Sequence, residues 1–348
     1  MAEKGSHFAS MLRSEIGLRN RKYAQGRLHV ESYGGAPVVV YVPDHPVDED
    51  VSAGTPARAC RHGNFFDAAY AAMQARPEWM RRFNKIHAQG RSLPRPVHDP
   101  SRKWRELDSS MSSDALLMNV FCTPGVMEAP AVRRALGVDS QTEPVFGWRA
   151  RVPLKSGRFD RTEVDMRWGG LLVEAKLTEG DFQSCKAAVV ETYRDFDVVF
   201  ERELLPRLEL RTARVKEAVE FPEEFTQEFE APVEDAEVAR VFQAEIVRRA
   251  IEAQPVDAGY ASYQLIRNVL AAYAEGESFC VVHDERRPDL REAWFQVMAA
   301  VKSAEMRVRC KVMTWQELTP LLPEELQEFL DVKYGIVGAG RRLASAVD

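Results

Sequence analysis

The sequence predicts an α/β fold: a sandwich of helices on both faces of a central mixed sheet, preceded by a helical extension. Three observations favour this class. Helix-like and strand-like segments alternate from residue 107 onward. A Gly-Gly pair joins two short strand-like runs within residues 162–179. A strand, a helix and a second strand then follow in residues 278–313. These observations together indicate one sheet that helices cover.

Composition restricts the class further. The chain has 348 residues, of which 45% are hydrophobic and 29% charged, which suits a globular protein. No apolar run approaches 18 residues, so no membrane helix is expected, and the first residues lack the apolar segment of a secretory signal. The five cysteines are odd in number and scattered. We therefore expect reduced thiols in a cytoplasmic protein.

The composition and the order of segments suggest a division of the chain. Residues 1–106 are expected to be an N-terminal extension with a basic helical segment, and residues 107–335 a core. Within the core, residues 178–255 are expected to be a helical and acidic insertion. The small, polar residues 336–348 are expected to be a flexible tail.

The elements before the Gly-Gly turn follow from apolar spacing and from turn residues. Residues 64–89 have helical spacing with a break near Pro77, and residues 107–122 predict a helix that Ser112 or Ser113 caps. A short helix is expected at 129–136 and a strand at 145–154.

The elements after the turn are predicted in the same way. Helices are expected at 180–200, 237–253 and 260–275, with an irregular acidic stretch at 203–236. The predicted C-terminal part consists of a strand at 278–283, a helix at 289–305, a strand at 306–313, and helices at 315–322 and 324–334.

The Gly169-Gly170 turn sets a register for the hairpin. Trp168 then faces Leu171, Met166 faces Val173 and Val164 faces Ala175, which gives one apolar face. On the other face, Asp165 lies opposite Glu174 and Glu163 lies opposite Lys176.

Two opposed carboxylates are the main clue to function. Asp165 and Glu174 should each raise the pKa of the other unless a cation lies between them, and a divalent metal ion is such a cation. Lys176 follows Glu174 by two residues and so points to the same face. The alternative is an exposed charged face with a Glu163–Lys176 ion pair and no metal. We prefer the metal site because rigid strands bring an Asp, a Glu and a Lys together.

This spacing resembles the PD-(D/E)XK nuclease superfamily, in which an acid on one strand precedes (D/E)-x-K on the next. Asp165, Glu174 and Lys176 match its positions, and Val164 stands where proline is common. The order of helix, three strands, helix and strand is also similar to that core. Residues 109–122 and 182–185 resemble bacterial restriction-endonuclease-like proteins. The resemblance implies a restriction-endonuclease-like sandwich.

The resemblance also implies a mechanism. Mg²⁺, or Mn²⁺ in its place, would be held by Asp165, Glu174 and the carbonyl oxygen of Ala175. Lys176 would orient the attacking water or stabilise the charge that develops on the phosphate. RecB-type members carry a Gln-led motif on a later helix, and Gln264 matches its first position, although Asn268 stands where that motif has Tyr.

Further residues are less specific. In several superfamily members the first core helix adds an acid, which Asp114 or Glu106 could supply here. Residues 55–105 hold eleven Lys and Arg against three acids, and this basic stretch either binds a phosphate backbone or is a solvated face. Gln264 could equally be an exposed polar residue on a packed helix.

The sequence thus predicts a metal-dependent nuclease, specifically a DNA endonuclease of restriction or defence type that acts on double-stranded DNA. Two alternatives remain open. One is a catalytically silent protein that binds nucleic acid and retains the fold, and the other is an interaction module that binds no metal. No membrane partner is expected, and the oligomeric state is open.

Overall fold

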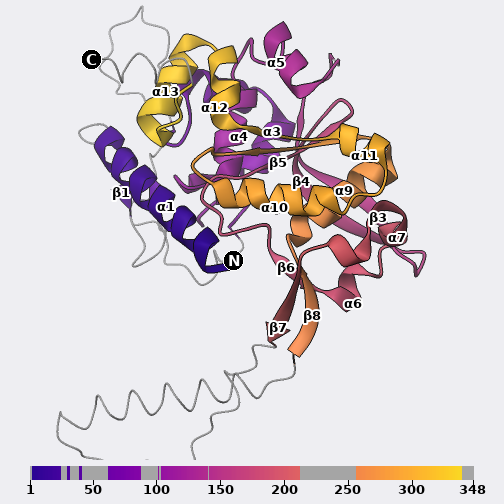
Figure 1. Cartoon of the computed structure of the whole chain (residues 1–348). Helices are drawn as coiled ribbons and strands as arrows, with labels where there is room; N and C mark the ends of the chain where they lie inside the picture. The colour runs from indigo at the N-terminus through magenta and orange to yellow at the C-terminus, as the bar shows by residue number, and fades with distance from the viewer. Residues whose placement is uncertain are drawn as a thin grey trace, which may run out of the picture.

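The computed structural model describes residues 2–24, 30–31, 39–40, 62–87, 101, 103–139, 141–211 and 256–338. Its central feature is a five-stranded sheet in the order β10-β9-β5-β4-β3 (Figure 1). The strands are β3 (Val145–Pro153), β4 (Phe159–Trp168), β5 (Leu171–Ala175), β9 (Ser278–His283) and β10 (Cys310–Thr314). β3, β4 and β5 pair antiparallel, whereas β5, β9 and β10 pair parallel. The predicted mixed sheet is therefore confirmed.

One face of the sheet is covered by helices from both ends of the chain. These are α1 (Ala2–Ala24), α2 (Asp67–Gln74), α3 (Pro77–Phe83), α4 (Ser113–Phe121), α5 (Pro130–Leu136), α12 (Trp315–Leu318) and α13 (Glu324–Tyr334). α4 supplies the centre of this core with Leu116, Leu117 and Phe121, and Ser112 caps it by accepting a hydrogen bond from the Ala115 amide, as predicted. Ile16 and Trp79 are buried in the same core, so α1 and α3 pack as parts of it.

The other face is covered by α9 (Tyr263–Glu275) and α10 (Pro288–Ala299), with α7 (Phe196–Val199) and α11 (Ala304–Arg309) beside them. Buried side chains of β5 alternate between the two cores, because Leu171 and Val173 face the α4 side and Leu172 faces the α9 side. The sandwich of helices on both faces is thus as expected.

A small second sheet corrects the prediction for residues 180–200. Instead of one helix, this part contains β6 (Ser184–Lys186), α6 (Ala187–Val190) and α7. β6 pairs with β8 (Val256–Ala261), which also pairs with β7 (Arg207–Arg211) after a 3-10 turn at Arg202–Leu204. Pairing with a strand distant in the sequence outweighs the local helical spacing. The predicted helix at 237–253 lies outside the described residues.

Other boundaries differ by a few residues. The strand expected at 306–313 begins only at Cys310, because α11 occupies the preceding residues. Two 3-10 turns lie at Glu106–Asp108 and Thr319–Leu321, and the pair β1 (Val30–Glu31) and β2 (Val39–Val40) forms a separate ladder. The tail was expected to begin at Ile336, but that side chain is fully buried in the core. Residues 339–348 lie outside the described part of the chain.

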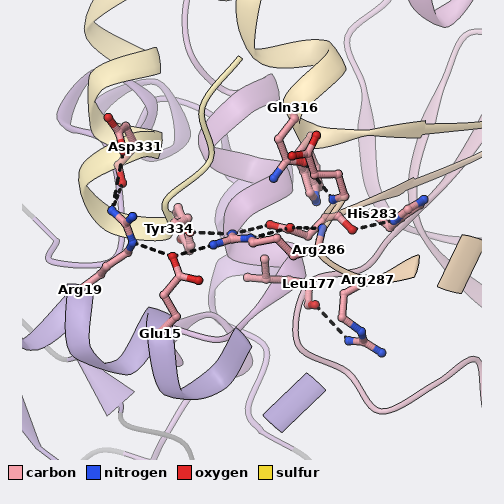
Figure 2. A network of polar contacts seen from close by, with 12 residues as sticks. Glu15, Arg19, Leu177, His283, Arg286, Arg287, Gln316, Asp331 and Tyr334 are labelled. Atoms are coloured by element: carbon pink, nitrogen blue, oxygen red, sulfur yellow. Dashed lines mark hydrogen bonds and ion pairs between the residues drawn. The ribbon is translucent and has the colours of Figure 1, made fainter. Parts of the chain in front are cut away.

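A polar network ties α1 to the core (Figure 2). Arg286, in the loop after β9, donates to Glu15 of α1 (2.8 Å) and to the carbonyl oxygen of Tyr334 (2.9 Å), while it pairs with Asp284. Arg19 of α1 donates to the carbonyl oxygen of Asp331 (3.0 Å). The N-terminal helix is therefore fixed to the loop that follows β9 and to the last helix.

Candidate active site

The hairpin has the predicted register up to one point. Trp168 pairs with Leu171 and Met166 with Val173, and Gly169 has φ +57°, which a tight hairpin turn requires of its first residue. The ladder between β4 and β5 ends at the Met166–Val173 pair. Beyond it, the Asp165 carboxylate accepts the hydrogen bond of the Ala175 amide (2.7 Å). The acid thereby lies at the point where the two strands separate.

Two of the contacts predicted across the hairpin do not form: Val164 with Ala175, and Glu163 with Lys176. Val164 packs in the α9-side core, although Met166 packs in the α4-side core. The register places Gly147, which has φ +64°, between the pairs Phe146–Met166 and Trp148–Val164, so the regular alternation of faces breaks there. The proposed Glu163–Lys176 contact does not form either, because the strands have already separated, and Glu163 instead accepts a hydrogen bond from Lys85 (2.5 Å).

Lys176 and Glu174 form the buried centre of the site. The Lys176 ammonium donates to Glu174 at 2.7 Å, and these residues are only 5% and 2% exposed. The ammonium also lies 5.6 Å from the centre of the Phe182 ring. Burial by itself would lower the pKa of Lys176, but Glu174, with Glu179 and Asp165, outweighs burial and raises this pKa. Lys176 therefore carries a full charge at neutral pH.

The pKa values of two acids of the site are raised. Burial raises the pKa of Asp165 well above its usual value, and the nearby Glu174 and Asp114 raise it further. Asp114 lies in the first turn of α4, where burial raises its pKa to about 6 despite the opposing effect of Arg82. Glu174 thus raises the pKa of Asp165, as expected of a neighbouring carboxylate, and a third acid, Asp114, adds to this effect.

The second oxygen of Glu174 accepts a hydrogen bond from Asn268 of α9 (2.9 Å), which is fully buried. Gln264 lies one turn earlier on the same helix. Its side-chain oxygen is buried and makes no hydrogen bond to any of the described residues, while its backbone amide donates to the carbonyl oxygen of Phe182 (2.9 Å). Of the two residues, the structure links Asn268 rather than Gln264 directly to Glu174.

The basic stretch contributes to the same region, but in a different way from that expected. Arg82 of α3 is only 7% exposed and pairs with Asp114 and Glu106, and Lys85 pairs with Glu163. Both cations therefore contact acids around the site. Arg82 is therefore neither part of a solvated face nor exposed to a phosphate backbone. The parts of the stretch at 55–61, 88–100 and 102 lie outside the described residues.

The loop after Lys176 is held from two sides. Glu179 accepts a hydrogen bond from the Ser113 hydroxyl (2.5 Å) and another from the Leu177 amide (2.7 Å). Arg287 is fully buried and donates to the carbonyl oxygens of Leu177 (3.2 Å), Glu179 (2.6 Å) and Gly180 (3.0 Å), the first of which is drawn in Figure 2. Sequence reasoning missed these roles, because no local spacing links Ser113 or Arg287 to the loop.

The carboxylate oxygens of the site are ligands of the kind that a hard divalent cation prefers. Within the part of the chain that the structure describes, no three His, Cys, Asp or Glu side chains stand close enough to hold a metal ion as they are arranged. The half-buried carboxylate of Asp165 and the buried carboxylate of Glu174 nevertheless provide two oxygen donors whose repulsion a divalent cation would relieve. The residues therefore fit Mg²⁺ or Mn²⁺, provided that Lys176 releases Glu174.

The mixed sheet with helices on both faces and the acids at the separating strands define a restriction-endonuclease-like α/β protein. The chain belongs to the family described as restriction endonucleases associating with ARP, which matches residues 19–335. Nothing among curated proteins or solved structures matched the chain. In the described residues, none of the helices is long and apolar enough to span a membrane.

Proposed function

We propose that this protein is a metal-dependent nuclease of the PD-(D/E)XK type. The observation that carries the proposal is the cluster of half-buried Asp165 with buried Glu174 and Lys176, and with Asp114 beside it, at the point where β4 and β5 separate. A site with perturbed carboxyl pKa values and a buried lysine is costly in stability, and such sites are typical of catalysis. The family supports the same class of activity.

Asp165, Glu174 and the carbonyl oxygen of Ala175 would hold Mg²⁺ or Mn²⁺. When bound, such an ion supplies a water of lowered pKa and neutralises charge on the phosphate. Asp114 is the acid that the first core helix would add, because it raises the pKa of Asp165 and its own side chain is only 19% exposed.

Lys176 would act on the reacting atoms. Its raised pKa keeps the ammonium charged, and a compact charge with three donors can orient the attacking water or stabilise the charge that develops on the phosphate. Gln264, whose side-chain oxygen has no partner among the described residues, is the further candidate for contact with the substrate. Asn268 would keep Glu174 in place from behind.

The proposed substrate is double-stranded DNA, and the proposed role is a restriction or defence endonuclease, in line with the family's description. That description also names an association with ARP, which we propose for this chain as well. The alternative is a catalytically silent protein that binds nucleic acid. It is favoured by one observation: Lys176 and Asn268 already occupy both oxygens of Glu174.

The two possibilities are separated by incubating the purified protein with linear and circular double-stranded DNA, with Mg²⁺, with Mn²⁺, and with a chelator. The proposal predicts strand cleavage that depends on the metal and that Asp165→Ala abolishes. DNA binding without cleavage under any of these conditions would favour the silent alternative.

A further inference from the structure

We propose that Arg82, from the N-terminal helical segment, is a positioning residue that holds Asp114 in the active site. This inference rests on the proposed nuclease function, and it extends the site beyond the core expected from the sequence. The active site would then include a residue of α3, and 29 residues lie between the end of α3 at Phe83 and the start of α4 at Ser113.

The contacts of Arg82 are made within the protein. One terminal nitrogen donates to Glu106 at 2.7 Å, and the other donates to Asp114 in a short contact. Glu163 lies 3.8 Å from the first nitrogen. Since the side chain is 6% exposed and both terminal nitrogens are taken by carboxylates, Arg82 is poorly placed to meet a DNA backbone. Its direct effect is on the acid of α4.

The fold leaves room for this guanidinium. At Gly147 of β3 a Cβ atom would lie 3.2 Å from Cδ and 3.6 Å from Nε of Arg82. The Nε of Arg82 is buried and makes no hydrogen bond to the described residues. Only glycine adopts this positive φ without strain, and an incompletely satisfied buried arginine is a costly feature. They occur together beside Asp114, which indicates that the placement of Arg82 serves the site.

Charge explains what the arginine does there. Asp114 is buried near Glu106, Glu179 and Glu174, all of which oppose its ionisation, and Arg82 is the cation that counteracts them. Without the guanidinium, the Asp114 carboxylate would lose its bonded partner and its fixed orientation. Lys85 is not a substitute, because it pairs with Glu163 and Glu106.

The test is a double-mutant cycle on the full-length protein with two measurements, cleavage of linear DNA at saturating Mn²⁺ and the Kd for Mn²⁺ alone. The variants are Arg82→Gln, Asp114→Asn and the pair of both. Arg82→Lys, which keeps a charge, and Arg81→Gln, an exposed neighbour on the same helix, serve as controls.

We expect Arg82→Gln to lower kcat about 10-fold or more and to change the Mn²⁺ Kd about fivefold or more, which lies within the coupling measured for residues in contact. In the Asp114→Asn background the same substitution should change neither quantity more than about twofold. Arg82→Lys should recover part of kcat, and Arg81→Gln should match the parent. Since Arg82→Gln leaves buried acids unpaired, circular dichroism checks folding, and Arg82→Lys provides the comparison if Arg82→Gln is unfolded.

Equal effects of Arg82→Gln in both backgrounds would overturn the inference, because the arginine would then act independently of Asp114. The inference would also be overturned if Arg82→Lys gave a folded protein whose kcat fell by the same factor in the Asp114→Asn background as in the parent. Failure of the proposed function looks different: the parent protein itself would neither cleave DNA nor bind Mn²⁺.

Discussion

Asn268 of α9 donates its side-chain amide to Glu174 of β5 at 2.9 Å, across the interface between the helix and the sheet. This bond fixes the carboxylate that Lys176 contacts from the other side. Asn268→Ala leaves one oxygen of a buried carboxylate without its donor, which costs about 1–3 kcal/mol. We expect lower stability and a fall in kcat on the order of 10-fold. Urea unfolding measures the stability and single-turnover cleavage measures the rate. The control is Tyr273→Ala, at a 37% exposed position of the same helix.

Asn268→Asp sharpens this prediction. It keeps the size of the side chain but places a further carboxylate directly against Glu174, which should raise the requirement for metal and lower activity more than Asn268→Ala does. An Asn268→Asp protein as active as the parent would show that the hydrogen bond to Glu174 has no part in the site.

Gly147 tests how tightly the site is built. Alanine there must adopt φ +64°, and its Cβ would lie 3.2 Å from Arg82. The left-handed conformation alone costs about 1–2 kcal/mol for a residue with a Cβ. We expect Gly147→Ala to lower the free energy of unfolding by at least that amount. Gly157→Ala is the matched control, since Gly157 also has a positive φ (+78°) and a Cβ there would meet nothing within 4 Å. Equal unfolding midpoints for the two variants would contradict the crowding at Arg82.

Arg287 fixes the loop that follows Lys176. Its guanidinium is fully buried and bonds Asp289 at 2.8 and 2.9 Å in addition to three loop carbonyl oxygens. Arg287→Gln leaves Asp289 unpaired and the carbonyl groups without donors, so we expect a loss of about 3–5 kcal/mol in the free energy of unfolding. Arg291→Gln, at an exposed position of α10, should leave the unfolding midpoint unchanged. If Arg287→Gln had the same unfolding midpoint as Arg291→Gln, the role of Arg287 in holding the loop would be contradicted.

The hairpin shows how much of the site could be predicted from the sequence. Local features sufficed for the register next to Gly169, because the turn and the alternation of apolar residues act over a few positions. They failed two residues further on, where Gly147 of another strand interrupts the alternation and Val164 turns to the opposite core. The structure nevertheless brings together the acids and the lysine that the sequence singled out, because they are close in the sequence.

Other site residues depend on contacts between distant segments. Arg82 reaches Asp114 across 32 positions and Asn268 reaches Glu174 across 94. No periodicity in one sequence encodes such pairs. The same limit explains the missed strand β8 and the wrong helix at 180–200, because β6 and β8 are 70 or more residues apart in the chain. The helices and strands of the core were predicted more closely because their apolar spacing is local.

Lys333 of α13 gives the protein a pH-dependent stability unrelated to the active site. It is fully buried, and burial lowers its pKa from 10.5 to about 7. Its ammonium donates to Asn20 of α1 at 2.6 Å and has no acid partner among the described residues. Because the folded state gives up this proton near pH 7 and the unfolded state only near 10.5, the unfolded chain binds more protons between them.

Stability contributed at this position should therefore rise with pH between about 7 and 10.5. Lys333→Met should flatten that part of the profile, which urea unfolding at a series of pH values measures. Lys302→Met, at a 40% exposed lysine, is the control and should keep the slope of the parent. An unchanged slope in Lys333→Met would show that the lysine stays charged in the folded protein.

Lys176→Ala tests the central claim most directly. The account assigns this buried ammonium to the chemical step, so its removal should slow single-turnover cleavage of double-stranded DNA by about 10²-fold or more. Binding of Mn²⁺ and of DNA should persist, whereas Asp165→Ala should lose metal binding as well. A folded Lys176→Ala protein that cleaves DNA at the parent rate would contradict the account, and the Lys176–Glu174 pair would then be structural only.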